Sequence, residues 1–307
     1  MSEKPFCRKF GWRRDLPDFR DFTVSHNELS AKVKEIGNQQ TILALLEKTG
    51  AGKLNTKKLP ATADLRKWCS PVEQQGNIGS CTAQAGVGMM EYFENRSFNK
   101  VLDASRLFLY KATRNLMKET GDVDGYLRFT MGAMALFGLP PEEYWPYIEE
   151  KFDEEPPAFC YAYAQNYQSL QYYRHDPNGT TKAAVLESVK KHLAAGLPSM
   201  FGFSVYSSYI QADTNGKIPY PAKGEKIAGG HAIMAVGYDD KMKIKNTNLK
   251  SPETTGALLI RNSWGTEWGE KGYGWLPFVT DKLDPSGLTD NLCCPKDRPI
   301  RSTRIGG

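Results

Sequence analysis

The chain has 307 residues, enough for a substantial core in one domain, or in a two-lobed domain with an appendage. Its mean hydropathy is −0.52 and no apolar run approaches the length of a membrane span, so the composition indicates a soluble globular protein. The formal net charge of +5 resides in residues 1–58, which hold 12 Lys and Arg against 7 Asp and Glu. Because that segment lacks a nucleic-acid-binding signature, we expect it to be solvated and to contact neither nucleic acid nor a membrane.

The N-terminus is charged and lacks the apolar stretch of a secretory signal, which favours a cytoplasmic protein, with non-classical secretion left open. The six cysteines form no CxxC pair and are too sparse for a disulfide scaffold. Since no ligand cluster accompanies them, we expect neither a metal nor a cofactor.

The first 58 residues predict a basic arm. Residues 1–22 are rich in Arg, Asp, Pro and aromatic residues, which favours an extended path over a surface. From Glu28 to Lys48, apolar residues recur at spacings of three, four and seven and are interrupted by Gly37 and Asn38, which predicts two short helices. A linker from Lys53 to Lys58 then leads to a second region that opens at Leu59.

The region after Leu59 predicts helices first and strands later. Helices are expected from Cys81, over Ser105–Met117 and over Arg128–Phe137. From residue 168 onward β-like runs dominate, interrupted by a helix over residues 181–194 on which His192 is expected to be solvated. Residues 241–256 are polar and charged and predict a surface insertion.

Cys81 is a candidate nucleophile because a glycine-marked loop delivers it onto the first turn of a helix. Ser80 is a favoured residue just before a helix start, and the unpaired N–H groups there favour the thiolate over the thiol. The small and apolar residues that follow, up to Phe93, indicate a buried central helix. Taken alone, however, Cys81 is better explained as a small buried hydrophobic residue, which is the commoner role of a free cysteine.

Two later motifs change that balance. His231 begins an apolar strand in GGHAIMAVGY, and Asn262 ends another in IRNSWGTEWGEKGYGW. With QGNIGSC around Cys81, these motifs resemble the papain-like cysteine peptidases, and the resemblance covers about residues 59–294. It implies an α+β papain-like two-lobed fold, with a helical left lobe, an antiparallel β-barrel-like right lobe and an active-site cleft between them.

The resemblance also implies the catalytic roles. Cys81 would attack the peptide carbonyl, and His231 would keep it ionised and then protonate the departing amine. Asn262 would orient the imidazole, and Gln75, six residues before the nucleophile, would donate to the oxyanion with the backbone N–H of Cys81. Trp264 would cover the hydrogen bond between His231 and Asn262.

The same resemblance implies how substrate is held. Gly125 would offer backbone hydrogen bonds to an extended substrate, and the pocket for the residue before the acyl donor carries no acid or base. We therefore expect an apolar preference there. The residues implied in substrate binding are Gly125, Tyr126, Leu127, Gly202, Gly230, Ala232 and Trp264.

Three domain segments follow, namely the arm over residues 1–58, the catalytic domain over 59–294 and a tail over 295–307. In the family the segment before the catalytic domain is often inhibitory, and we expect this arm to stay attached and to cover part of the cleft. Thr82 and Gly230 depart from the residues usual beside the nucleophile and the histidine, without removing a chemical role.

The most direct interpretation is a monomeric endopeptidase that acts on protein or peptide substrates through an acyl-enzyme. The alternatives are an exopeptidase, deamidase or transpeptidase on the same constellation, and a non-catalytic binding protein with a relic site. A cleft blocked by the arm or by residues 241–256 would favour the first alternative.

Overall fold

The computed structural model describes residues 8–16, 18, 21, 23, 58–169, 172–248 and 251–278, and the backbone of residues 290–295. The helices expected over residues 28–48, the linker over 53–57 and nearly all of the tail over 295–307 lie outside the described residues. No helix among the described residues is long and apolar enough to span a membrane.

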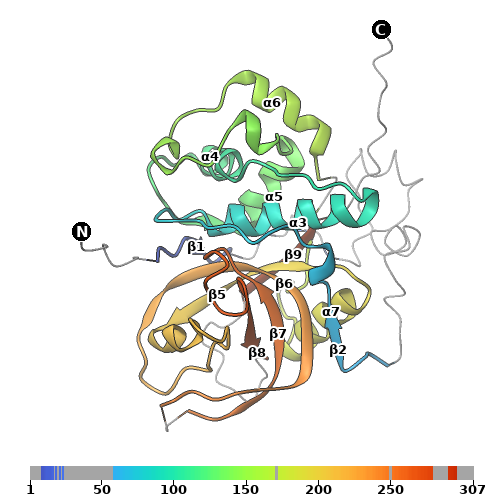
Figure 1. Ribbon diagram of the computed structural model, residues 1–307, viewed down its shortest axis with the longest axis vertical. Coiled ribbons are helices and arrows are strands. Elements are labelled where there is room, and N and C mark those ends of the chain that lie inside the picture. The colour runs from blue at the N-terminus through green and yellow to red at the C-terminus, as the bar shows by residue number, and fades with distance from the viewer. Residues whose placement is uncertain are drawn as a thin grey trace.

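The described part of the domain has two lobes, one helical and one built on a sheet, as the α+β expectation requires (Figure 1). The helical lobe holds the α-helices α3 (Cys81–Phe98), α4 (Arg106–Met117), α5 (Leu127–Leu136) and α6 (Ala158–Ala164). The sheet lobe carries α7 (Lys182–Ala194). Short 3-10 turns, numbered η1 to η5, span Arg66–Trp68, Glu142–Tyr144, Glu149–Lys151, Gln165–Tyr167 and Ser207–Ala212.

A seven-stranded antiparallel sheet forms the second lobe, in the order β4-β9-β5-β6-β7-β8, with β2 paired to β6. Its strands are β2 (Thr62–Asp64), β4 (Tyr172–Arg174), β5 (Ser199–Tyr206), β6 (Ile227–Ile244), β7 (Thr254–Arg261), β8 (Tyr273–Pro277) and β9 (Asp290–Pro295). The sheet curls so that the central strands face the helical lobe (Figure 1).

Capping explains where two helices begin. Ser105 accepts a hydrogen bond from Phe108 N at the start of α4, and Thr181 accepts one from Ala184 N at the start of α7. Both caps satisfy a backbone donor that the first helical turn leaves unpaired. The sequence predicted these two helix starts within one residue.

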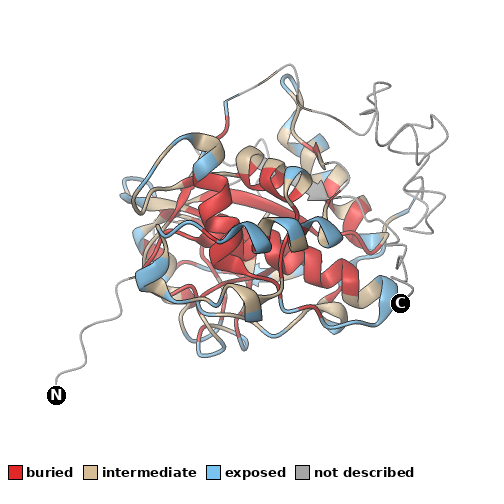
Figure 2. Ribbon diagram, turned by 90° about the horizontal axis from the view of Figure 1, so that it is seen from above, coloured by how far each residue is buried: buried red, intermediate tan, exposed pale blue. Residues whose placement is uncertain are grey.

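Helix α3 is buried along its first 14 residues, from Cys81 to Glu94, and its C-terminal end reaches the surface (Figure 2). Small residues let neighbouring helices approach, since a Cβ on Gly86 would lie 3.0 Å from Leu109 of α4. The expectation of a buried central helix is therefore confirmed.

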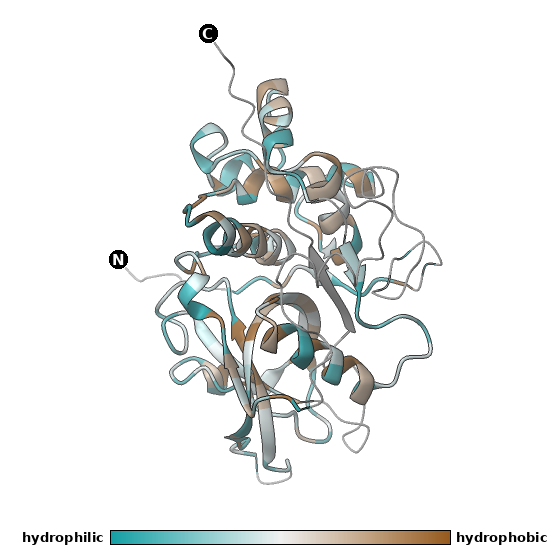
Figure 3. Cartoon of the chain, turned by 90° about the vertical axis from the view of Figure 1, so that its right-hand side faces the viewer, coloured by the Kyte–Doolittle hydropathy of each residue, from teal (hydrophilic) through white to brown (hydrophobic). Residues whose placement is uncertain are grey.

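Two expectations are corrected by tertiary packing. His192 is buried rather than solvated, since only 3 % of it is exposed and its ring meets that of His175 edge to face at 4.4 Å. Residues 241–256 are not simply a polar loop, because β6 continues to Ile244 and pairs there with Thr254 at the start of β7. This hairpin lies at the hydrophilic end of the sheet lobe, away from the helical lobe (Figure 3).

The N-terminal segment lies between the two lobes. Strand β1 (Trp12–Arg13) pairs in parallel with β3 (Gly125–Tyr126), the two-residue strand that precedes α5. Figure 1 shows β1 at the junction of the lobes, beside α3 and above the sheet. Residues some 70 to 220 positions apart in the chain thus meet at this junction.

Candidate active site

Cys81 is the first residue of α3 and is fully buried at the junction of the lobes. Its sulfur accepts a hydrogen bond of 3.4 Å from Ala232 N, on the residue that follows His231 in β6. Ser80 precedes the helix as expected, but its hydroxyl pairs with Tyr147 at 2.6 Å instead of capping the helix. The sulfur and the histidine strand therefore meet across the junction.

Asn262 holds the His231 ring through one of its two nitrogens, Nε2. Its Nε2 lies 2.8 Å from Asn262 Oδ1, which also accepts from Ser263 N at 2.9 Å. Because the amide oxygen accepts both bonds, Nε2 carries the proton and Nδ1 keeps a lone pair. His231 Nδ1 is buried and makes no hydrogen bond to any described residue.

Trp264 covers the pair of His231 and Asn262. The indole stacks on the imidazole with the ring centroids 4.6 Å apart and the planes 18° from parallel. Trp268 meets Trp264 edge to face at 5.4 Å and supports it from behind. Water is thereby kept away from one face of the imidazole.

Gln75 is fully buried beside the same loop. Its Oε1 accepts from Ser263 Oγ at 2.6 Å, which leaves the Nε2 amide group as a donor. Nε2 donates to the carbonyl oxygens of Lys9 and Ile78, each at 3.1 Å. The bond to Lys9 places a peptide carbonyl of the arm where an oxyanion would be stabilised.

The arm also fills the space expected for substrate. Gly125 N donates to Gly11 O at 2.7 Å, and a Cβ added to Gly202 would lie 1.9 Å from the Trp12 ring. A Cβ on Gly230 would meet Trp12 O at 2.2 Å. Four residues implied in substrate binding, Gly125, Gly202, Gly230 and Trp264, thus contact the arm or lie beside it. A fifth, Ala232, contacts the sulfur itself.

The two remaining residues implied in substrate binding lie at the start of α5. The Arg13 guanidinium of the arm lies 5.7 Å from the ring of Tyr126. Leu127 is fully buried as the first residue of the helix. The structure therefore places every residue of the expected set at or near this junction, and it adds Phe10 and Trp12 of the arm.

Burial changes the protonation of the site relative to the expectation from the helix N-terminus. Burial raises the pKa of the Cys81 thiol to about 12, against the effect of the hydrogen bonds that its sulfur accepts. Burial also lowers the pKa of His231 to about 4, against its bond to Asn262. With the arm in place, a neutral thiol and a neutral imidazole are the favoured forms.

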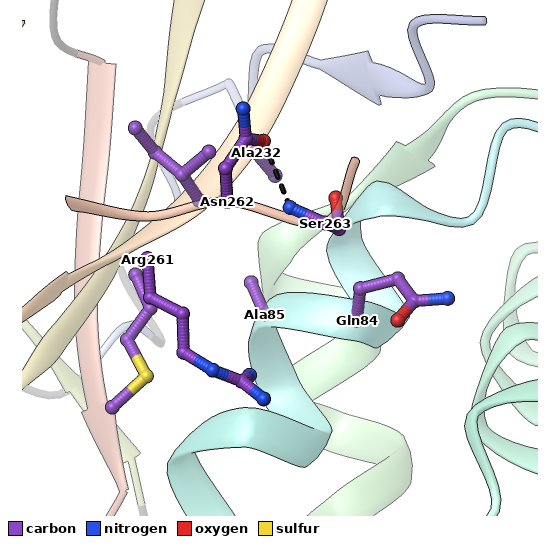
Figure 4. A pocket seen from close by; sticks show the side chains of 8 residues that line it. Gln84, Ala85, Ala232, Arg261, Asn262 and Ser263 are labelled. Carbon is purple, nitrogen blue, oxygen red and sulfur yellow. Dashed lines mark hydrogen bonds between the residues drawn. The ribbon is translucent and has the colours of Figure 1, made fainter. Parts of the chain in front are cut away.

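A small cavity of about 10 Å³ lies behind Asn262, between α3 and the β6 and β7 strands (Figure 4). Gln84, Ala85 and Arg261 are among the residues that line it. That volume holds no more than about one water molecule, so the cavity is not a substrate pocket.

Within the described residues no group of three or more His, Cys, Asp or Glu side chains is arranged to hold a metal. The three described cysteines, Cys69, Cys81 and Cys160, are free thiols. Of these, only Cys81 lies beside a histidine that is oriented by a second side chain.

Comparisons with known proteins identify the family of the chain. The sequence profile described as "Papain family cysteine protease" matches residues 59–291. An uncharacterised peptidase C1-like protein of Acanthamoeba polyphaga mimivirus is 28% identical over 288 residues, covering 91% of this chain and 84% of the viral protein. Cathepsin K of Gallus gallus is 31% identical over 226 residues, covering 71% of this chain and 59% of the cathepsin.

Solved structures show the same fold. Xylellain, a cysteine protease from Xylella fastidiosa, superposes with a TM-score of 0.70 at 28% identity, covering 94% of this chain and 95% of xylellain. A cysteine protease of Carica candamarcensis in complex with E-64 superposes with a TM-score of 0.56 at 22% identity, covering 78% of this chain and all of the plant protein. The chain therefore belongs to the papain family of cysteine proteases and is a papain-like cysteine peptidase.

Proposed function

We propose that the protein is an endopeptidase that hydrolyses peptide bonds through an acyl-enzyme on Cys81. In this proposal His231 Nδ1 takes the thiol proton and returns it to the leaving amine, while Asn262 keeps the imidazole in the required tautomer. Gln75 Nε2 stabilises the oxyanion. The observation that carries the proposal is the hydrogen bond between His231 and Asn262 next to a sulfur at a helix N-terminus.

Labelling by an epoxysuccinyl inhibitor, followed by mass spectrometry, tests the role of the thiol. In the full chain with Trp12→Ala, whose pocket is no longer filled by the indole, we expect one adduct per chain, lost when Cys81→Ala is added and kept when the matched control Cys69→Ala is added. An adduct that survives Cys81→Ala would contradict the assignment. Mass spectrometry of the products from a denatured protein then separates an endopeptidase, which cuts at internal bonds, from an exopeptidase, deamidase or transpeptidase.

We further propose that the arm inhibits the enzyme in the intact chain. Phe10 packs against both His231 and Trp264, with each pair of ring centroids 6.1 Å apart. The backbone carbonyl oxygen of Lys9 accepts the hydrogen bond that Gln75 Nε2 donates, and Trp12 is buried with only 6 % exposed. An arm in this position excludes substrate and keeps the catalytic pair neutral.

The direction in which the arm runs explains why the enzyme would not cleave its own arm. Gly11 lies at the sulfur, since its backbone N–H lowers the pKa of the Cys81 thiol, and Trp12, the next residue, fills the pocket. In a substrate the pocket residue comes one before the acyl donor, so its chain runs in the opposite direction. Attack on the arm would therefore place the leaving amine away from His231.

The arm lies on both sides of Cys81, so it leaves neither end of the cleft selectively open. Arg8 lies 4.8 Å from the ring of Trp264 on one side, and β1 continues toward α5 on the other. The hairpin of residues 241–256 lies more than ten residues along β6 from His231. Occlusion of the cleft on both sides of Cys81 favours a latent endopeptidase over an exopeptidase.

Comparing the turnover of the full chain with that of a chain beginning at Leu59 tests the inhibition. We expect the shorter chain to cleave a peptide substrate much faster. Equal turnover by two folded proteins would remove the inhibitory role of the arm.

A further inference from the structure

Two arginines of the catalytic domain hold a carboxylate beyond the pocket that Trp12 fills. Arg128, the second residue of α5, donates from Nε to Asp21 Oδ1 at 2.7 Å and from Nη2 to Oδ2 at 2.6 Å. Arg174, at the end of β4, donates from Nη1 to the same Oδ2 at 2.7 Å. Asp21 has only 8% of its side chain exposed, so a carboxylate fits this site in a bidentate and nearly dry arrangement.

Arg128 also receives a second carboxylate from the arm. Asp15 Oδ2 accepts from Arg128 N at 3.3 Å, and Asp15 Oδ1 lies 3.7 Å from its Nη1. The Asp15 side chain is 2% exposed. Asp15 is three residues after Trp12, and three extended residues span about 10 Å. Arg128 therefore lies within reach of a chain whose side chain fills the Trp12 pocket.

The arm supplies all of the acidic partners that Arg128 has among the described residues. Displacement of the arm, which substrate entry requires, would leave this guanidinium without a carboxylate, whereas Arg174 would keep Asp176 at 3.0 Å. Because the arm itself covers part of Arg128, what is lost on displacement is the set of charge-assisted hydrogen bonds to Asp15 and Asp21. An acidic group on the incoming chain would restore the lost bonds.

We propose that Arg128, assisted by Arg174, is a substrate subsite for an acidic side chain. The acidic residue would stand about three positions N-terminal to the large apolar residue that enters the Trp12 pocket, because the acyl part of a substrate runs opposite to the arm. This inference rests on the proposed peptidase function and names the class of chain that the enzyme selects. The inhibitory arm resembles such a chain in its side chains and differs from it in direction.

The preference for a large apolar residue in the pocket follows from the contacts of Trp12. Gly202 and Gly230 leave room for an indole, and the buried Trp12 Nε1 makes no hydrogen bond to any described residue. Shape and apolar burial therefore hold the side chain, so phenylalanine serves as the pocket residue in a test substrate.

The test uses the full chain with Trp12→Ala, Asp15→Ala and Asp21→Asn, which removes the competing groups of the arm. Its substrates are fluorogenic peptides with phenylalanine in the pocket position and aspartate, asparagine or lysine three residues before it. We expect kcat/KM for the aspartate peptide to exceed that for the asparagine peptide by about tenfold, with lysine lowest. Raising the salt concentration should reduce this ratio.

Arg128 variants in the same background identify the residue responsible. Arg128→Gln should bring the ratio of the aspartate to the asparagine peptide to about one, and Arg128→Glu should favour the lysine peptide. Lys100→Gln, an equal charge change at an exposed position after α3, should keep the original ratio. Thermal melting checks that each variant is folded, and if the Arg128 variants unfold, the salt dependence of the ratio decides.

The outcomes separate this inference from the proposed function. Cleavage of all three peptides at equal rates, at low and high salt, would overturn the acidic subsite and leave the endopeptidase intact. Failure to cleave any of the peptides, in a chain whose Cys81 still reacts with an epoxysuccinyl inhibitor, would overturn the endopeptidase and the subsite with it.

Discussion

Replacing Trp12 by alanine should activate the intact chain. The indole is buried in the pocket, with 6 % of Trp12 exposed, and it lies against Gly202 and Gly230 without a hydrogen bond to any described residue. Burying a side chain of this size is worth roughly 4–6 kcal/mol as an upper limit. Truncations of buried aromatic residues to alanine cost about 3–5 kcal/mol in protein cores.

A loss of about 3 kcal/mol in arm docking raises the ratio of open to closed chains about a hundredfold. The initial rate on a fluorogenic peptide should therefore rise by up to about this factor, and less if the open fraction approaches one. The alkylation rate of Cys81 should rise in parallel, because both reactions need the same open cleft. The remaining arm contacts, such as the ion pair of Arg8 with Asp213, limit the effect.

Leu16→Ala is the matched control, since Leu16 belongs to the same arm but is 76% exposed. We expect this variant to keep the low rate of the parent chain. If Trp12→Ala and Leu16→Ala turn over substrate at the same rate, apolar burial of the indole does not hold the arm in the cleft, and the reasoning fails.

The remaining predictions concern the oxyanion donor, the pocket and the pH dependence of the arm. Gln75→Ala, in a chain with a displaced arm, should lower kcat by about 10²–10³, whereas Gln74→Ala should have little effect, and equal losses would remove Gln75 from the oxyanion site. Gly202→Val should displace the arm, because the new side chain fills the pocket. It should also lower the ratio of kcat/KM for a substrate with phenylalanine in the pocket to kcat/KM for one with alanine there, at least about tenfold. An unchanged ratio would place the pocket elsewhere. Burial, with a smaller contribution from the neighbouring Asp21 carboxylate, raises the pKa of Asp15 in the docked arm to about 6. While Asp21 is also docked, the protonated form of Asp15 therefore docks better, and docking strengthens as pH falls from about 6 to about 4. Burial opposes the ionisation of Asp21, but its two arginine partners hold its pKa below the ordinary value, so docking is lost only as pH falls below about 4. Hydrogen exchange of residues 8–16, corrected for intrinsic rates, should show more protection at pH 5 than at pH 7, and less protection at pH 5 would refute this account.

Local signals in the sequence were sufficient for much of the fold. Ser105 and Thr181 mark helix starts because a hydroxyl satisfies a backbone donor within three residues, whatever the rest of the chain does. The buried run after Cys81 predicted a central helix because an all-round apolar helix has no stable place on a surface. The order and the neighbours of Cys81, His231 and Asn262 indicated the family. In the structure His231 pairs with Asn262, and Ala232, the residue after His231, donates to the Cys81 sulfur.

Long-range packing decided what local patterns could not. The two residues before His192 in the sequence are lysines, which suggests a solvated face of a helix. Tertiary packing nevertheless buries His192 beside His175. Residues 241–256 extend two strands because each satisfies the backbone groups of the other, which a polar composition does not reveal.

The sequence by itself determined the family and the candidate residues for its chemistry, because the candidate nucleophile, base and orienting amide each stand in a distinctive local motif. Only the tertiary structure decided their state. Phe10 and Trp12 lie in a charged segment with no periodicity, so nothing near them in the chain indicates what they pack against. Their partners are glycines and aromatic rings some 200 residues away. The packing at this junction buries Cys81, and that burial raises the pKa of its thiol, whereas the start of a helix alone would favour the thiolate.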